Sequence, residues 1–301
     1  MTAVRKPTWI AADWGTSNVR FWAMGEDGAV LGKRTSADGM WSLVSSEYEG
    51  VLNQSCNEWL ETATTVVACG MVGSRQGWVE APYQTAPCAV CPNQMVTAPV
   101  QRAGLTVHVI PGIRQTDPAD VMRGEETQIA GFLAQNDGWD GIICLPGTHT
   151  KWVHVSAGEV VSFQTCMSGE LFALLAEQSV LRHSIADDGW DEDAFIDALS
   201  QTMSRPERIA GQLFSLRAAQ LVHDTNTQTL RARLSGLLIG AELAATKPYW
   251  LGQNVALIGA EAVSMPYIAG LAAQGVAVTR ADASDMTLAG IRAAHALLEV
   301  I

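Results

Sequence analysis

The sequence predicts an α/β protein made of two related domains, each with a mixed sheet. A unit of strand, Gly-Thr corner and second strand occurs twice, around Gly15 and around Gly147. After each unit, helix-like and strand-like segments alternate, which is typical of a duplicated α/β fold. The length of 301 residues fits two domains of ordinary size better than one.

The first unit has the composition of a phosphate and metal site. Residues 8–36 are predicted to form three strands, the first ending at Asp13 and turning over Gly15, Thr16 and Ser17. A carboxylate is a hard oxygen ligand suited to Mg²⁺. Glycine lets the backbone approach a phosphate, and hydroxyl and N–H groups donate to phosphate oxygens. The alternative is an ordinary hairpin, because short motifs also match by chance.

The second unit repeats this order of parts within residues 141–165. An apolar strand leads to a corner at Gly147 and Thr148, and Lys151 follows as a source of positive charge. The identity between the two units is slight, and hairpins are common. Two hairpins that each open on strand–Gly–Thr are less common, and they indicate two domains that present phosphate-facing loops to a shared cleft.

The other elements follow from apolar periodicity and from turn residues. A Pro-rich segment is interpreted as a loop insertion that lines a site. A late strand is expected to enter a helix through a glycine turn at Gly259. The expected elements are a helix over 43–64, a buried strand over 66–73, the loop-rich segment 74–100, a strand over 105–110, a helix over 119–135 capped by Asp117 or Asp120, mostly helical segments over 170–183 and 191–246, a strand over 255–260, a helix over 261–274, a strand over 276–279 and a helix over 286–299.

Composition excludes several classes of function. The net charge of −12 argues against non-specific binding to nucleic acid or to an anionic membrane. Cys88 and Cys91 form a C-x-x-C pair, but no second ligand pair supports a zinc site. The longest apolar stretch, 234–245, is too short to span a membrane, and no secretory segment is recognised. We therefore expect a cytoplasmic protein with reduced thiols.

The standard nucleotide motifs are absent, so a phosphate site would depend on the Gly-Thr corners. Neither a P-loop nor a G-x-G-x-x-G sequence opening a helix occurs. Phosphoryl transfer to a hydroxyl also requires a metal and a carboxylate that orients the attacking oxygen. The candidate carboxylates are Asp117, Asp120, Glu125 and Glu126. Acids in the first turns of a helix also complement its dipole, which is the alternative role for the two glutamates.

A loop after the buried strand suits a small hydroxylated acid. Arg75 can hold a carboxylate, Gln76 can bond hydroxyls and Trp78 lies next to them in sequence. Arg20 is a further candidate for charge near the first corner. The alternative for such arginines is a solvated loop position. Gly259 can let an adenine or ribose lie against backbone, or it can belong to a plain tight turn.

Four stretches together resemble the 2-dehydro-3-deoxygalactonokinase family of the sugar-kinase/hsp70/actin superfamily. They are residues 12–17, 70–78, 121–128 and 145–151. The resemblance implies two duplicated actin-like (ribonuclease H-like) domains with a cleft that closes on substrate. It also implies phosphorylation of 2-dehydro-3-deoxy-D-galactonate on its 6-hydroxyl by ATP with Mg²⁺, in galactonate catabolism.

The second corner departs from the superfamily pattern Asp-x-Gly-Gly-Thr, because Leu145 and Pro146 precede Gly147. No second metal-directed aspartate is therefore assigned. Residues 124–126 are similar to the loop that carries a catalytic glutamate in exopolyphosphatase-type relatives, which favours Glu125 over Asp120 as the base.

The resulting hypothesis divides the chain at residue 115. Residues 1–115 would form a domain for substrate and phosphate, and residues 116–301 a domain for nucleotide, with the last helix, about 286–301, able to pack back on the first. The expected partners are ATP and a sugar acid, with neither nucleic acid nor membrane, and a homodimer is one open alternative. The rival functions are a phosphatase of the same fold, such as an exopolyphosphatase, and a sugar-acid-binding regulator. The expected site residues are Asp13 for the metal; Gly15, Thr16, Ser17, Gly147, Thr148, Lys151 and Gly259 for ATP; Arg20, Arg75, Gln76 and Trp78 for the sugar acid; and Glu125 or Asp120 as base.

Overall fold

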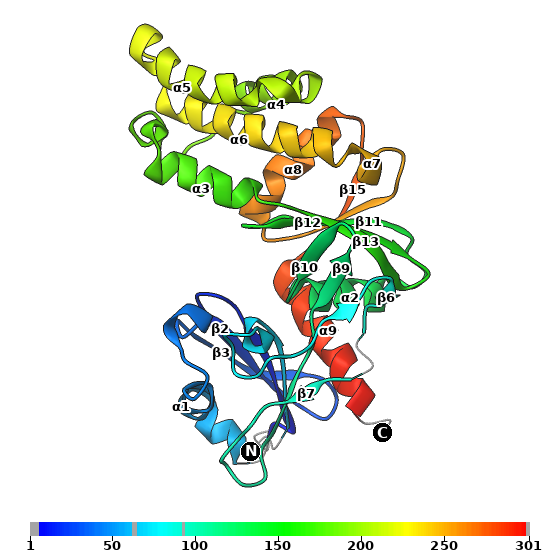
Figure 1. The fold of residues 1–301 in the computed structure, drawn as a ribbon. Coiled ribbons are helices and arrows are strands. Elements are labelled where there is room, and N and C mark those ends of the chain that lie inside the picture. Colours follow the sequence, from blue (N-terminus) through cyan, green and yellow to red (C-terminus); the bar gives the residue numbers. More distant parts are fainter. Residues whose placement is uncertain (1–5, 62–64, 92–93, 299–301) are drawn as a thin grey trace, which may run out of the picture. The chain divides into compact units, whose positions relative to one another are not determined.

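The structure, a computed structural model, describes residues 6–61, 65–91 and 94–298 (Figure 1). Its contacts divide the chain into two compact units. The first comprises the residues up to Trp139, residues 156–162 and the residues from Ala283 onward. The second comprises residues 140–155 and 163–282. The second unit is therefore inserted, in sequence, between parts of the first.

The first unit is built on a six-stranded mixed sheet with the order β3-β2-β1-β4-β8-β7. The hairpin strands β1, β2 and β3 pair antiparallel, whereas β4 runs parallel to both β1 and β8. The strands are β1 (Trp9–Trp14), β2 (Val19–Met24), β3 (Val30–Ser36), β4 (Thr65–Gly70), β7 (Val96–Thr97) and β8 (Thr106–Val109). Two 3₁₀ turns, η1 (Met40–Ser42) and η2 (Met71–Gly73), and helix α1 (Tyr48–Leu60) complete this part.

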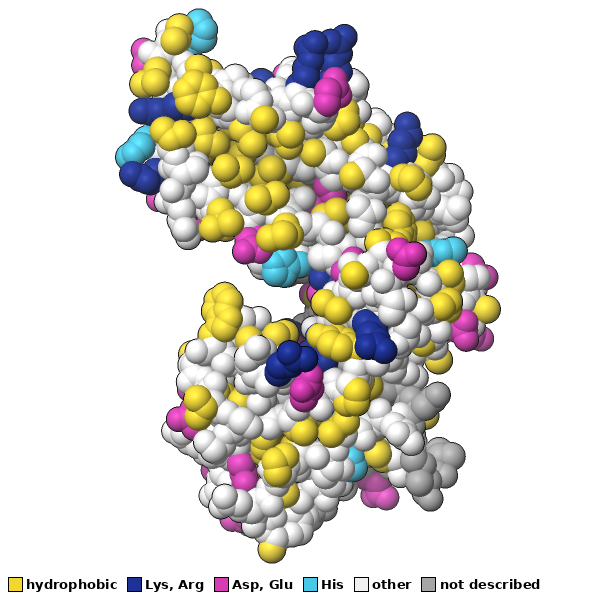
Figure 2. All heavy atoms as spheres, viewed as in Figure 1, with side chains coloured by type: hydrophobic (Ala, Val, Ile, Leu, Met, Phe, Trp, Pro, Cys, Tyr) yellow, Lys and Arg dark blue, Asp and Glu magenta, His cyan; other side chains and the backbone are white. Residues whose placement is uncertain are grey.

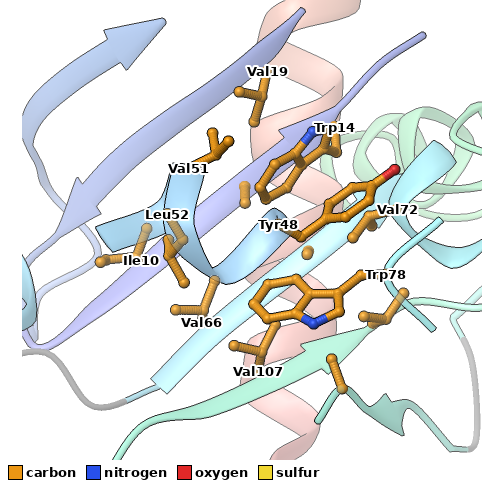
Figure 3. Close-up of a cluster of buried hydrophobic side chains, with 14 of the residues drawn as sticks. Ile10, Trp14, Val19, Tyr48, Val51, Leu52, Val66, Val72, Trp78 and Val107 are labelled. Atoms are coloured by element: carbon orange, nitrogen blue, oxygen red, sulfur yellow. The ribbon is translucent and has the colours of Figure 1, made fainter. Parts of the chain in front are cut away.

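Side-chain alternation along β1 gives this sheet two buried faces. Ile10 and Trp14 point into one core, where the rings of Tyr48 and Trp78 pack with them (Figure 3). Trp9 belongs to a second core on the other face, and its ring stacks on His295 at a centroid distance of 3.9 Å. This period of two is the expected signature of a strand buried on both sides.

Helices α2 (Glu125–Gln135) and α9 (Ala283–Leu298) pack at backbone contact distance within the first unit. A Cβ added at Gly131 would lie 1.9 Å from the carbonyl oxygen of Met286. A Cβ added at Gly290 would lie 1.8 Å from the carbonyl oxygen of Thr127. Only glycine fits at both crossing points, and the absence of a side chain there lets the backbones of α9 and α2 approach each other closely.

A small sheet of order β10-β9-β5 precedes α2, and here the predicted helix over 119–135 is wrong at its beginning. Residues 119–122 are a strand because they pair antiparallel with residues 113–116. The residue before α2 is Gly124, whose φ of 105° lies outside the helical region. The helix therefore begins at Glu125 instead of near Asp117 or Asp120. The strands are β5 (Gln84–Thr85), β9 (Ile113–Thr116) and β10 (Ala119–Met122), and β6 (Cys88–Ala89) pairs with residues 159–160.

The second unit repeats the hairpin and the parallel partner strand. In its sheet, β11 pairs antiparallel with β12 and parallel with β14, and β14 pairs parallel with β15. The strands are β11 (Gly141–Leu145), β12 (Thr150–Ser156), β13 (Glu159–Cys166), β14 (Val255–Ile258) and β15 (Val278–Ala281). The last residue of β12 and the first four residues of β13 belong to the first unit by their contacts. Two units, each with a mixed sheet and helices, confirm the predicted α/β class.

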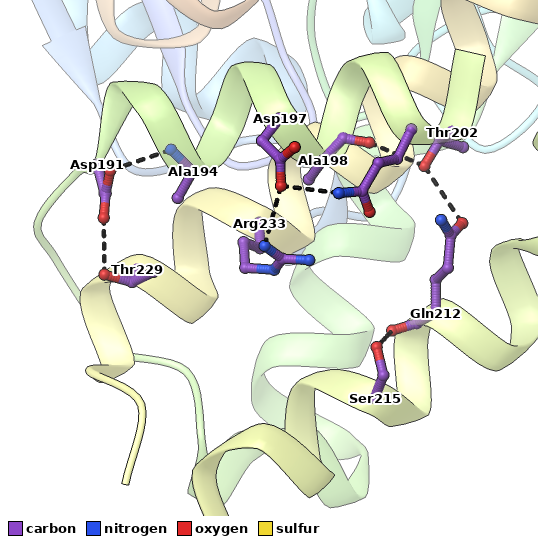
Figure 4. A network of polar contacts seen from close by, with 10 residues as sticks. Asp191, Ala194, Asp197, Ala198, Thr202, Gln212, Ser215, Thr229 and Arg233 are labelled. Atoms are coloured by element: carbon purple, nitrogen blue, oxygen red, sulfur yellow. Dashed lines mark hydrogen bonds and ion pairs between the residues drawn. The ribbon is translucent and has the colours of Figure 1, made fainter. Parts of the chain in front are cut away.

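Helix α6 (Thr227–Ala245) is the centre of the helical part of this unit. Side-chain contacts join α4 to α6: the Thr229 hydroxyl donates to Asp191 at 2.7 Å, and Arg233 pairs with Asp197 at 3.3 Å (Figure 4). The other helices are α3 (Ser168–Gln178), α4 (Glu192–Ser204), α5 (Ile209–His223), α7 (Lys247–Trp250) and α8 (Glu261–Ala273), with 3₁₀ turns η3 (Val180–His183) and η4 (Pro206–Arg208).

Not all apolar residues of these helices are buried. On α5 only Leu216 is buried, while Phe214 and Leu221 are more than half exposed. Hydrophobic side chains gather over the helical part of the second unit on the face drawn in Figure 2. Across the described residues, no helix combines the length and hydropathy of a membrane span.

The α2–α9 crossing makes a direct prediction for stability. Gly131→Ala should lower the free energy of unfolding by about 1–3 kcal/mol or more, because the new methyl group meets rigid backbone. Gly50→Ala on α1 is the matched control, since nothing lies within 4 Å of its Cβ position. It should leave stability unchanged or raise it by up to about 1 kcal/mol. Urea unfolding of both variants measures the two changes in stability. Equal unfolding midpoints for Gly131→Ala and Gly50→Ala would contradict the close contact between α2 and α9.

Candidate functional site

In the first unit, Asp13 stands at the end of β1 with a partner for each carboxylate oxygen. Arg20 lies opposite on β2 and pairs with Oδ2, its Nε donating at 3.0 Å. The Cys69 thiol on β4 donates to Oδ1 at 3.7 Å. Arg20, expected to contact the sugar acid, is therefore engaged by Asp13 here. A hard cation would have to bind on the Oδ1 side, away from the guanidinium.

The corner after Asp13 is held by main-chain hydrogen bonds. The Gly15 N–H donates to the Asn18 carbonyl at 2.8 Å, and the Trp41 N–H donates to the Thr16 carbonyl at 3.0 Å. Ser17 is exposed and Thr16 half-buried. The corner thus has a defined backbone shape, and the Ser17 side chain on it is exposed.

The beginning of α2 meets the end of β4 close to Asp13. A Cβ on Gly124 would lie 3.6 Å from the Gly70 Cα, and a Cβ on Gly70 would lie 3.5 Å from Asp13 Oδ1. Burial raises the pKa of the Cys69 thiol well above its usual value, and the charges of Asp13 and Glu126 raise it further. The structure therefore brings the first residues of α2 and the Asp13 carboxylate into one neighbourhood.

The two glutamates at this helix start differ in environment. Glu126 is buried, with Oε2 accepting the Gly124 N–H at 2.6 Å and Oε1 accepting the Thr127 hydroxyl at 3.0 Å. Burial raises its pKa to about 7, with a further contribution from the charge of Glu125. Glu125 is half-buried and accepts the Arg123 N–H at 3.0 Å. Asp120 lies on β10, where its carboxylate accepts the Val121 N–H at 2.7 Å.

The loop after β4 places its three predicted sugar-acid residues differently. Arg75 is exposed and pairs with Glu80 at 3.4 Å, and Gln76 is also exposed. Trp78 instead lies in the core, 4% exposed, with its indole N–H donating to the Pro99 carbonyl at 3.1 Å. Its aromatic neighbours account for this burial, so a direct substrate contact by Trp78 is unsupported.

In the second unit, the Gly147–Thr148 corner abuts the N-terminus of α3. A Cβ on Gly169 would lie 2.2 Å from the Gly147 carbonyl oxygen, so a side chain there would displace the corner. The Glu170 N–H donates to the Thr148 carbonyl at 3.0 Å. Lys151 is 5% exposed, and its ammonium donates to the His149 carbonyl at 3.3 Å. A helix N-terminus and a buried lysine together favour an anion.

The same corner forms one wall of a pocket of about 930 Å³ within the second unit. This volume is typical of a small-molecule site. Helices α6 and α8 supply apolar walls, Asp187 and Asp188 supply carboxylates, and the Arg231 guanidinium lies over the Phe172 ring at 4.9 Å. No sequence motif marks the polar side of this pocket, because its residues come from separate elements.

Gly259 lies beside this corner and not among the residues that line the pocket. Its N–H donates to the Ala281 carbonyl at 3.2 Å, and its Cβ position is 3.5 Å from the Pro146 ring. It therefore supports the strand–corner junction. Among the described residues, no group of three or more His, Cys, Asp or Glu side chains could hold a metal by itself.

The fold of the two units is the actin-like ATPase fold. The activator of 2-hydroxyisocaproyl-CoA dehydratase from Clostridium difficile, solved with bound ADPNP, shares it with a TM-score of 0.54 and 13% identity, over 97% of this chain and 94% of that chain. Residues 13–294 match the family described as 2-keto-3-deoxy-galactonokinase, and the chain belongs to this family. The family is one of ATP-dependent sugar kinases, so the predicted resemblance is confirmed.

Individual relatives agree over nearly their whole length. A protein of Rhizobium meliloti (strain 1021), named a probable 2-dehydro-3-deoxygalactonokinase, is 38% identical over 95% of this chain and 96% of its own. The 2-dehydro-3-deoxygalactonokinase of Escherichia coli (strain K12) is 34% identical over 96% of this chain and 98% of its own. The crystal structure of a candidate 2-dehydro-3-deoxygalactonokinase from Sinorhizobium meliloti has a TM-score of 0.89 and 36% identity, over 97% of this chain and 100% of that chain.

The buried Glu126 predicts a pH dependence of stability. Its folded pKa of about 7 lies above the usual 4.5, so the fold favours the protonated carboxyl. That contribution is complete below pH 4.5 and is lost as the pH rises through about 7. Relative to Glu126→Gln, the wild type should lose on the order of 3 kcal/mol across this interval.

Chemical unfolding at several pH values measures this difference. Glu26→Gln, at an exposed position of the same unit, is the control and should follow the wild type. If the free energy of unfolding changed with pH in the same way for the wild type and for Glu126→Gln, the predicted pKa shift of Glu126 would be contradicted.

Proposed function

We propose that this protein transfers the γ-phosphoryl group of ATP to the 6-hydroxyl of 2-dehydro-3-deoxy-D-galactonate. The observation that carries the proposal is the similarity, over almost the whole chain, to proteins named 2-dehydro-3-deoxygalactonokinases. The pocket of the second unit, with the Gly147–Thr148 corner in its wall, supports nucleotide binding. The product would be the 6-phosphate of the sugar acid, with ADP released.

The nucleotide would lie in the pocket of the second unit. Its phosphates would reach the Gly147–Thr148 corner, where Lys151 and the N-terminus of α3 supply positive potential. Asp187 and Asp188, which line the pocket, would accept hydrogen bonds from the ribose hydroxyls. The apolar walls from α6 and α8 would hold the base.

The first unit would supply the groups around the reacting oxygens. Asp13 fits a Mg²⁺ ligand through Oδ1, since Mg²⁺ commonly uses one or two carboxylates together with phosphate oxygens and water. Bound there, the cation would neutralise charge on the β- and γ-phosphates. Gly15, whose N–H is bonded to Asn18, would let the backbone approach the phosphates, and Thr16 and Ser17 would donate to their oxygens. Arg75 and Gln76 would bind the sugar acid. Arg20 would orient the Asp13 carboxylate.

Glu125 is the proposed base, in preference to Asp120. It lies at the beginning of α2, which contacts the end of β4 beside Asp13, and it is only half-buried. In this role it would orient the 6-hydroxyl and accept its proton as the phosphoryl group is transferred. Glu126 would hold the turn that presents Glu125, through its hydrogen bond to Gly124.

The proposed reaction is tested by coupled ADP release with MgATP and a panel of sugar acids. The wild type should turn over 2-dehydro-3-deoxy-D-galactonate, and Asp13→Ala should lower kcat/KM about 1,000-fold, because the developing charge loses its metal ligand. A higher Mg²⁺ requirement for Asp13→Asn would separate metal binding from folding damage. If none of the sugar acids caused ADP release, or if the protein hydrolysed polyphosphate instead, the kinase proposal would be contradicted.

The assignment of the base is tested by two isosteric variants. Glu125→Gln should lower kcat about 100- to 10,000-fold with little change in the KM for ATP, since proton transfer is lost while binding remains. Asp120→Asn is the matched comparison and should retain most of the activity. The reverse result would assign the base to Asp120.

A further inference from the structure

A buried carboxylate in the second unit is used by no step of the proposed reaction. Glu242 on α6 is 4% exposed. Its Oε1 accepts the indole N–H of Trp152 at 2.7 Å, and its Oε2 accepts the Tyr267 hydroxyl at 2.9 Å. The Ser168 side chain also hydrogen-bonds to it. One carboxylate therefore joins α6 to β12, to α8 and to the first residue of α3.

The hydrogen bonds around Glu242 have a defined direction. A phenol has one proton, and Tyr267 gives it to the carboxylate, so its oxygen accepts from the Thr150 hydroxyl at 2.9 Å. The Thr150 oxygen in turn accepts the Gly147 N–H at 3.4 Å. The series Gly147, Thr150, Tyr267, Glu242 thus runs from the corner to the buried carboxylate.

Burial of the Glu242 carboxylate carries a cost that its hydrogen bonds offset. Burial raises the pKa of Glu242, and the hydrogen bonds from Ser168, Trp152 and Tyr267 oppose that effect. Cys144 on β11 is a further titratable neighbour, and its pKa is raised by burial and by the charges of Glu242 and Cys166. Apolar side chains of similar volume generally stabilise a core as well as a buried ionic network does. What such a network adds is a fixed orientation of its members.

Two elements that meet at the corner are attached to this network. Thr150 begins β12, directly after the corner, and Ser168 begins α3, whose N-terminus contacts Gly147 and Thr148. The Tyr267 hydroxyl is directed to Thr150 and Glu242, although Tyr267 also lines the pocket. Ser168 also lines the pocket, whereas Thr150 and Glu242 do not. The shape of the corner therefore depends in part on side chains that lie outside the pocket lining.

We propose that Glu242 is a positioning residue that, through Tyr267 and Thr150, fixes the Gly147–Thr148 corner for the phosphates of the nucleotide. This inference rests on the proposed nucleotide site. It adds that buried side chains hold the corner that would bind the phosphates. Loss of the network should weaken binding of ADP and ATP. Binding of adenosine, which has no phosphate, should be unchanged.

The test uses hydroxyl deletions that preserve shape, in the full chain. Thr150→Val and Tyr267→Phe should each weaken ADP binding about 10-fold by calorimetry, because a buried hydrogen bond of the series is lost. Adenosine affinity and the KM for the sugar acid should not change. Thr150→Ser restores the hydroxyl and should restore ADP affinity. Glu242→Gln should also weaken ADP binding, because an amide NH2 donates where the carboxylate accepted, which reverses the hydrogen bond to Tyr267 and the direction of the series.

Thr202→Val is the matched control, since it removes a buried hydroxyl of α4 that bonds the Ala198 carbonyl outside the series. It should lower the melting temperature without changing ADP affinity. Unchanged ADP affinity in Thr150→Val and Tyr267→Phe would overturn the inference, and so would an equal loss for adenosine. A wild type that binds neither ADP nor adenosine would remove the proposed function and the inference together.

Discussion

Both units depend on one constraint: the first strand of an antiparallel hairpin must also pair, in parallel, with a strand that comes much later in the chain. β1 pairs with β4 in this way, and β11 with β14. Parallel strands end at the same sheet edge, so the corner after the hairpin strand meets the turn after its partner. Asp13 thereby reaches Gly70, and Pro146 reaches Gly259. In each unit, turn residues that are far apart in the sequence therefore lie next to each other.

A second regularity is that a buried glutamate lies behind each of these edges. Glu126 binds the N–H of Gly124 in the first unit, and Glu242 reaches the corner of the second through Tyr267 and Thr150. Carboxylates are costly to bury and are retained only with their hydrogen bonds made. Loops that must keep one shape while ligands enter and leave benefit from such fixed acceptors, since apolar packing alone does not orient a backbone N–H.

The parts of the fold that the sequence predicted are those encoded locally. Both hairpins, the corners after them and the buried strand before Gly70 follow from alternation and turn residues. The local sequence of residues 119–122 favours a helix, whereas their strand conformation depends on pairing with β9. The position of Trp78 next to Arg75 and Gln76 favours the substrate loop, whereas its packing against Trp14 and Tyr48 has no local signal because these partners lie far away in sequence. The pocket acids and Glu242 carried no local signal, since their roles exist only after the helices of the second unit have packed.

The order of the elements along the chain has a consequence for synthesis on the ribosome. The first unit is completed by α9, which follows the whole of the second unit in sequence. Until α9 is made, the face of α2 that receives it, including Gly131, stays uncovered, and so does one side of the β1–β4 pair. The second unit can mature while translation continues. The unit that begins first therefore finishes last, and its open face is exposed to chaperones and proteases in the interval.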